Sequence, residues 1–162
     1  EQKNQLRKPL LVKFSPDLND EQINDIGKIM LKYSNETQTH GQIDGMIISN
    51  TTITRPADLK SPARLVKEEG GLSGPPLRKL STEMIRKMYR LTNGSIPIIG
   101  VGGIETGLDA YEKIKAGASM VQLYTSMIYF VRIFFRENIC LIFNYNFFLL
   151  LLSFELGTTH RS

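Results

Sequence analysis

The chain has 162 residues, with 20 lysines and arginines against 16 aspartates and glutamates, and a formal net charge of +4. A chain of this length can bury the core of one ordinary domain. Its basic and acidic residues are interleaved, and no basic stripe with interleaved aromatic residues is present. Composition therefore favours a solvated, charged surface over a nucleic-acid interface.

Few side chains suit metal or disulfide chemistry. The single cysteine, Cys140, excludes an intrachain disulfide. The two histidines, His40 and His160, are too few for a zinc site in a chain without a CxxC pair. His40 lies in a polar stretch, where a solvent-exposed role is simpler than a catalytic one. We therefore predict no metal site.

The N-terminal residues carry no signal-peptide pattern, because no charged n-region or apolar h-region precedes the first predicted strand. That strand is expected very soon after Glu1. We therefore expect an N-terminal part of the protein to be missing from this sequence.

The first half of the chain predicts a strand, a helix and a second strand. The apolar segment Pro9 to Pro16 is typical of a buried strand. A helix is expected to start within residues 17–20, and its apolar residues recur at helical spacing to about Lys32. The polar stretch 34–42 predicts a surface insertion, and Asp44 to Asn50 predicts the second buried strand.

The middle of the chain is irregular. Residues 51–80 show no sustained period, and a stretch that long between elements is more often functional than accidental. Ser81 is a favourable N-cap for a second helix, which Asn93 and Gly94 end.

The third and fourth strands are predicted over Ile96 to Gly102 and Met120 to Ser126, with a helix between them that Gly117 closes. Strands and helices thus alternate, which predicts an α/β fold of four parallel strands with right-handed crossovers. A glycine cluster ends the third strand and Tyr124-Thr125 ends the fourth. Such paired ends form the phosphate site of a (β/α)8 barrel, or TIM barrel, which usually needs roughly 250 residues. We therefore predict half of such a barrel.

The chain changes character after Met127. Residues 128–162 are rich in Phe, Leu and Ile without a clean helical or alternating period. Their longest nearly uncharged part, Ile139 to Phe154, has 16 residues, fewer than the roughly 20 that span a bilayer. We therefore predict a partial barrel domain over 9–127 and an atypical hydrophobic tail over 128–162. The tail lies outside the barrel or packs against it, and is an aggregation hazard if exposed.

Functional residues of a barrel lie at the carboxyl ends of its strands. Near the end of the first predicted strand, Lys13 carries an ammonium in an apolar segment, where an unpaired charge is costly. It could extend into solvent, act as a fixed cation facing a flavin or a substrate anion, or serve as a Schiff-base nucleophile. The residues alone leave these three roles open.

The other strand ends carry polar groups and glycines. Asn50 and Thr51 supply an amide and a hydroxyl suited to orienting a small planar amide or imide, although simple turn chemistry uses the same residue types. Gly102 and Gly103 offer backbone N–H groups to a phosphate, and Thr125 offers a backbone or hydroxyl donor. These residues point to a phosphate-bearing cofactor.

The chain contains, in this order, the segments LVKFSPDL, IISNTTITRP, GGLSGPPLRKLSTEMIRKMY and IPIIGVGGIETGLDAYEKIKAGASMVQLYT. Together they closely resemble the C-terminal half of class 2 dihydroorotate dehydrogenases, the quinone-linked, membrane-associated members of that flavoenzyme family. The likeness runs from about Pro9 to Met127.

The resemblance implies an FMN-containing TIM barrel that oxidises dihydroorotate to orotate in pyrimidine synthesis and passes the electrons to ubiquinone. It implies a location at the mitochondrial inner membrane. Asn50 and Thr51 would hydrogen-bond the orotate. The implied FMN contacts are Lys13 at the flavin ring, Ser49 where the family usually has threonine, Gly74, Gly103, Tyr124 and Thr125. Of these, Gly103, Tyr124 and Thr125 would lie at the FMN phosphate.

The resemblance also implies what this sequence lacks. In the family, the serine base and the N-terminal helices that form the quinone tunnel and membrane contact precede the strand that holds Lys13. We therefore assign no catalytic residue to this chain and predict turnover near zero. The residues after Met127 do not resemble the family's final helix.

Two other functions stay open at this point. A half barrel could be a non-catalytic module that binds phosphate or flavin, or that docks on another half, since its open strand edges need covering. A different barrel enzyme could use Lys13 as a Schiff-base nucleophile.

Overall fold

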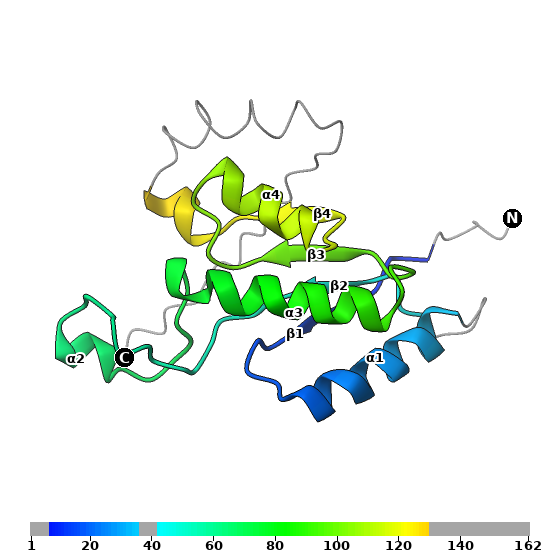
Figure 1. The fold of residues 1–162 in the computed structure, drawn as a ribbon, viewed down its shortest axis with the longest axis horizontal. Helices are drawn as coiled ribbons and strands as arrows, with labels where there is room; N and C mark the ends of the chain where they lie inside the picture. Colours follow the sequence, from blue (N-terminus) through cyan, green and yellow to red (C-terminus); the bar gives the residue numbers. More distant parts are fainter. Residues whose placement is uncertain (1–6, 36–41, 130–162) are drawn as a thin grey trace, which may run out of the picture.

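The structure is a computed structural model that describes residues 7–35 and 42–129. Its centre is a parallel sheet of four strands in the order β1-β2-β3-β4, with helices between them (Figure 1). The strands are β1 Leu11–Phe14, β2 Gly45–Ile48, β3 Ile98–Val101 and β4 Met120–Gln122. The predicted α/β fold of four parallel strands is confirmed, and within the described ranges no further strand closes the sheet into a barrel.

Helices follow the strands, as predicted. They are α1 Asp20–Ser34, α2 Ala63–Val66, the 3-10 helix η1 Pro75–Leu77, α3 Arg78–Leu91 and α4 Gly107–Lys115. Residues 125–129, after β4, are helical as well. Reciprocal side-chain bonds fix the start of α1, between Asn19 and Gln22, and the start of α4, between Thr106 and Asp109. Each pair satisfies backbone N–H groups that the first helical turn leaves free, so the sequence determines where both helices begin.

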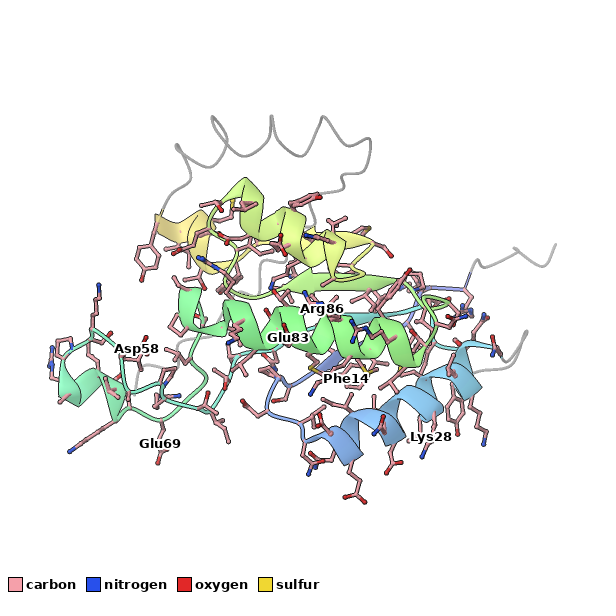
Figure 2. All side chains as sticks on the ribbon, viewed as in Figure 1. Phe14, Lys28, Asp58, Glu69, Glu83 and Arg86 are labelled. Carbon is pink, nitrogen blue, oxygen red and sulfur yellow. The ribbon has the colours of Figure 1, made fainter. Side chains whose placement is uncertain are left out.

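One face of the sheet packs against α1 and α3. Side chains alternate between the two faces along a strand, so Met46, Ile48 and Ile98 point to the same side. There they form the main core with residues of both helices, including Ile85 of α3. Figure 2 shows Phe14 of β1 between α1 and α3, where it packs against this core.

The opposite face of the sheet is more open. Lys13 lies beside Ile47 in the register of β1 and β2, and Ile47 lies beside Ile99 of β3. Leu11 and Lys13 are exposed, although they belong to a strand. Inward-facing and outward-facing residues alternate along barrel strands, so this is the face that would point inward in a closed barrel.

The start of α3 corrects one prediction. We expected Ser81 to cap this helix, but α3 begins at Arg78, and Ser81 lies fully buried inside it. The reason is the pair Pro75 and Pro76, which form η1 and lead the chain directly into α3 with φ already fixed. The Ser81 hydroxyl lies 3.1 Å from the carbonyls of both Arg78 and Gly102.

The strands are shorter than predicted. We expected them to end at residues 16, 50, 102 and 126, but they end at Phe14, Ile48, Val101 and Gln122. The polar residues at the predicted ends therefore follow the strands, and residues 125–126 already belong to a helical turn. The backbone N–H groups of Ser49 and Asn50 still donate to the carbonyls of Val101 and Phe14.

Some predictions fall outside the described residues. They concern Cys140, His160, the region around His40 and the tail from residue 130 onward. The domain boundary between residues 127 and 128 stays a prediction. In the ranges 7–35 and 42–129, every helix is too short or too polar to cross a membrane.

The core between sheet and helices makes a direct stability prediction. Ile85→Ala removes a fully buried side chain and leaves a cavity, so we expect the free energy of unfolding to fall by about 3 kcal/mol. The matched control is Ile29→Ala on α1, where the side chain is 52% exposed and the loss should stay within about 0.5 kcal/mol. Urea denaturation followed by circular dichroism measures both; equal losses would contradict this core.

Candidate functional site

A cleft of about 270 Å³ opens at the carboxyl ends of the strands. Because the four strands are parallel, the loops that follow them meet at this edge. The cleft is lined by every residue that the sequence predicted for cofactor or substrate binding: Lys13, Ser49, Asn50, Thr51, Gly74, Gly103, Tyr124 and Thr125. They share one site, while the role of each stays a prediction.

Lys13 is the only basic residue among the described residues that line the cleft. Its side chain is exposed, so the expected cost of an ammonium enclosed by apolar groups does not arise. A Schiff-base lysine depends on desolvation or a neighbouring cation, and this exposed position supplies no desolvation. The arrangement suits a cation that can reach a ligand in the cleft.

Hydrogen bonds within the loop after β2 hold the side chains of Ser49 and Asn50 in place. Ser49 is buried, and its hydroxyl donates to the carbonyl of Asn50 at 2.9 Å. The side-chain oxygen of Asn50 accepts the backbone N–H of Thr51 at 2.9 Å. This bond uses the amide oxygen and leaves the amide NH₂ of the exposed Asn50 to face a ligand.

Two charged side chains hold the irregular loop that follows. The Asp17 carboxylate accepts the Thr52 hydroxyl and, at 2.9 Å, the backbone N–H of Ile53. The Arg55 guanidinium donates to the backbone carbonyls of six residues: Thr52, Ile53, Thr54, Val66, Glu68 and Gly70. A bridge from Thr52 to Leu72 then returns the chain to the cleft. Apart from the short helices α2 and η1, contacts of side chains rather than regular secondary structure hold this stretch, which is why its sequence has no sustained period.

Glycine is required where the end of β3 meets the start of α3. Gly102 and Gly103 have φ of 108° and 70°, which side chains rarely allow. A Cβ on Gly103 would lie 2.5 Å from the backbone nitrogen of Arg78. Gly74, with φ of 81°, lies in contact range of the Thr125 methyl group. These glycines let backbone approach the cleft closely from both sides.

An arginine behind the cleft was missed by sequence reasoning. Arg78 Nε donates to the Gly103 carbonyl at 2.9 Å, and Nη2 donates to the Glu105 carboxylate at 3.0 Å. Nε also lies 3.1 Å from a carboxylate oxygen of Asp109. Arg78 therefore ties the first turn of α3 to the loop between β3 and α4.

A buried lysine lies beside it. Lys113 of α4 is fully buried, and its Nζ donates to the hydroxyls of Ser81 at 2.6 Å and Thr82 at 2.8 Å. Burial lowers the pKa of Lys113 from 10.5 to about 8, with Asp109 opposing the shift and Arg78 adding to it. Its sequence signal was weak: Lys113 follows the buried Ala110 by three residues, which places both on one helix face.

The cleft contains donors that fit a phosphate. The backbone N–H groups of Gly103 and Ile104, outside any helix or strand, donate to no acceptor in the described part of the chain. The Ser126 hydroxyl is buried and has no hydrogen-bond partner there either. Unpaired buried donors are costly, so a ligand rich in oxygen acceptors would be favoured. Ser126 was read only as the end of a strand, and nothing in its sequence context distinguished it.

The described ranges contain no cluster of side chains that could bind a metal ion. No group of three or more His, Cys, Asp or Glu side chains lies close enough there to hold a metal ion.

Comparison with known proteins gives a consistent result. A family model described as dihydroorotate dehydrogenase matches residues 1–140. The chain is 52% identical over 118 residues to the mitochondrial dihydroorotate dehydrogenase (quinone) of Mus musculus, covering 73% of this chain and 27% of that protein. It is 48% identical over 123 residues to dihydroorotate dehydrogenase (quinone) of Xanthobacter autotrophicus, covering 76% of this chain and 32% of the relative.

Solved structures agree. The chain matches a ligand-free DHODH from Eimeria tenella with a TM-score of 0.74 and 47% sequence identity, over 86% of this chain and 36% of that one. It matches a complex of Eimeria tenella DHODH with ferulenol with a TM-score of 0.68, over 84% of this chain and 32% of that one. The chain therefore spans about a third or less of the length of these proteins.

The buried lysine makes stability depend on pH. Between pH 8 and 10.5 the unfolded chain holds more protons at Lys113 than the folded chain, so the free energy of unfolding should rise with pH across this window. The total rise from this group is about 3 kcal/mol. Lys113→Met should remove this rise in the free energy of unfolding, while the other titratable groups contribute equally in both proteins. Urea denaturation between pH 7 and 11 tests this; pH profiles that run parallel would contradict it.

The unpaired Ser126 hydroxyl makes a second prediction. Ser126→Ala removes a buried donor that has no partner in the free chain, so we expect the free energy of unfolding to rise by about 1 kcal/mol. Ser81→Ala is the control, because it removes a buried hydroxyl that is hydrogen-bonded and should lower stability instead. Thermal denaturation of the two variants measures the difference, and a destabilised Ser126→Ala protein would refute the assignment.

Proposed function

The chain belongs to the dihydroorotate dehydrogenase family, and from that premise we propose that it supplies the phosphate-binding half of an FMN site. We propose that the complete site oxidises dihydroorotate to orotate and that a quinone receives the electrons, since the relatives are named dihydroorotate dehydrogenase (quinone). The observation that supports this proposal is the single cleft that gathers residues from the ends of all four strands.

The residues of the cleft divide by chemistry. The exposed Lys13 ammonium would face the flavin ring, where a cation stabilises the charge that develops on reduction. The phosphate would be held by backbone donors and by the residues that face them across the cleft. The proposed phosphate contacts are Gly103, Tyr124 and Thr125, and Ser49 and Gly74 are the other proposed FMN contacts.

Asn50 and Thr51 are proposed to orient the substrate. The amide NH₂ of Asn50 is free to donate, because its oxygen already accepts the Thr51 backbone N–H. Dihydroorotate carries ring carbonyls and a carboxylate that accept such donors. FMN bound beside it would supply the two-electron redox chemistry, and the chain's own residues would hold both molecules in register.

We assign the general base of the reaction to none of these residues. The chain spans 27% to 36% of the length of the proteins compared above, and we propose that the rest of a complete enzyme supplies the base and the quinone contact. The chain matches relatives that are named mitochondrial and also relatives from bacteria. We propose a location at the mitochondrial inner membrane because the chain resembles class 2 enzymes.

A second candidate is a non-catalytic assembly module. The open face of the sheet, with Leu11 and Lys13 exposed, and the unpaired outer edges of β1 and β4 in the described sheet favour it. Such a module would associate through these edges and would bind flavin only after association.

Flavin binding by the purified full chain tests the proposal. We expect FMN to bind, with quenched flavin fluorescence, and dihydroorotate-dependent dye reduction to stay near background. Lys13→Met should weaken FMN binding roughly tenfold, because it removes a charged contact to the ring. Lys28→Met, an exposed lysine on α1, is the control and should bind like the unmodified chain.

Three outcomes would contradict parts of this assignment. Failure of FMN to bind at any chain concentration would overturn the flavin site. Binding only to dimers or larger assemblies in sedimentation would favour the assembly module. Clear turnover by the chain alone would refute the absence of a base.

A further inference from the structure

The phosphate end of the cleft has no cationic side chain of its own. Lys13 is the only basic residue in the described lining, and it lies at the end of β1, three strands away from β4. Two cations, Arg78 and Lys113, instead lie behind the backbone of Gly102 and Gly103, outside the lining. Their hydrogen bonds, direct for Arg78 and through Ser81 for Lys113, link these positive charges to the backbone that lines the cleft.

The orientation of a peptide carbonyl fixes the orientation of the N–H group in the same peptide. A trans peptide is planar, with its carbonyl and its N–H pointing in opposite directions. The only cis peptide in the described residues is elsewhere, between Ile48 and Ser49. A carbonyl of Gly102 drawn backward therefore turns the N–H of Gly103 forward, and a carbonyl of Gly103 drawn backward turns the N–H of Ile104 forward.

The first carbonyl is held through Ser81. An ammonium can only donate, so the Lys113 Nζ–H···Oγ bond of 2.6 Å makes the Ser81 hydroxyl an acceptor. Its own proton then has two acceptors in reach, the carbonyls of Arg78 and Gly102, each at 3.1 Å. The Arg78 carbonyl already receives the Thr82 hydroxyl at 2.8 Å and Lys113 Nζ at 3.3 Å, so Gly102 is the favoured acceptor of the Ser81 proton.

The second carbonyl is held directly. Arg78 Nε donates to the Gly103 carbonyl at 2.9 Å. The same guanidinium pairs with Glu105, a carboxylate that lines the cleft and would otherwise repel an anion. Each buried or half-buried cation thus polarises one peptide group, and hydrogen bonds in such a chain strengthen one another.

Glycine makes these restraints necessary. Successive glycines have wide φ and ψ freedom, so Gly102 and Gly103 do not fix the orientation of their own peptides. Without acceptor contacts behind them, either N–H could turn away from the cleft. Both carbonyls have such contacts, and both N–H groups have no acceptor in the described part of the chain.

We propose that Lys113, acting through Ser81, and Arg78 are positioning residues that aim the Gly103 and Ile104 N–H groups at the phosphate of the ligand. This inference rests on the proposed flavin-phosphate site. It assigns the buried Lys113 a task beyond packing α3 against α4, and it adds Ile104 to the donors of the site.

The test compares FMN with riboflavin, which lacks the phosphate, on the full chain. Ser81→Ala and Lys113→Met should lower the FMN-to-riboflavin affinity ratio roughly tenfold, because a charge-assisted contact to the phosphate is lost, and should leave riboflavin affinity unchanged. Thr82→Val is the matched control: it removes another Lys113 partner that has no contact with Gly102, and it leaves Lys113 Nζ within 3.3 Å of the Arg78 carbonyl. Its ratio should stay within about twofold of the unmodified chain. Fluorescence titration gives the affinity of each of the four proteins for FMN and for riboflavin.

An unchanged ratio in Ser81→Ala, or an equal fall in Thr82→Val, would overturn the inference. If the chain binds neither flavin, the proposed function fails, and inorganic phosphate then tests the positioning separately by ¹H–¹⁵N spectroscopy. Phosphate should move the amide resonances of Gly103 and Ile104 in the unmodified chain but not in Ser81→Ala. Resonances that do not respond in the unmodified chain would refute the inference.

Discussion

The common direction of the four strands is the constraint on which the site depends. Each strand is short, and none carries a site by itself. Because all of them run the same way, segments that are far apart in sequence reach the same edge: the loop residues 49–51, 73–74 and 102–104, and residues 124–126, which enter a helical turn at residue 125. An antiparallel order would send half of these loops to the opposite end of the sheet.

The contact between the end of β3 and the start of α3 links packing to chemistry. Gly103 leaves room for the backbone of Arg78, and Arg78 in turn holds the Gly103 carbonyl. Beneath them, Lys113 bridges α4 to α3 through two hydroxyls. The same polar groups therefore seat α3 on the sheet and shape the backbone at the cleft. A fold with an apolar seam here would pack as well but would not direct amide donors.

The fold was predictable because its signals are local. Buried parallel strands are continuous apolar runs, and Gly117 closes α4 as its position predicted. Most residues of the cleft were predictable because strand ends have fixed positions in this architecture, whereas Gly74, in the loop before η1, was predicted from the family resemblance. Ser81 misled because a serine before an apolar helical face resembles a cap, while the two prolines upstream decide where α3 begins. The burial of Lys113 could not be predicted from local sequence, because the partners that surround it come from another helix.

The course of the loop between β2 and α3 is set by the Arg55 guanidinium, which donates to the main-chain carbonyls around it, and, where the loop begins, by the Asp17 carboxylate. Those carbonyls are present whatever side chains the intervening residues carry. Mutational drift through the middle of this loop should thus be nearly neutral for its course, whereas Arg55 tolerates no exchange for lysine, whose compact ammonium lacks the planar fork. Selection on the course of this segment is concentrated in two codons, those of Asp17 and Arg55.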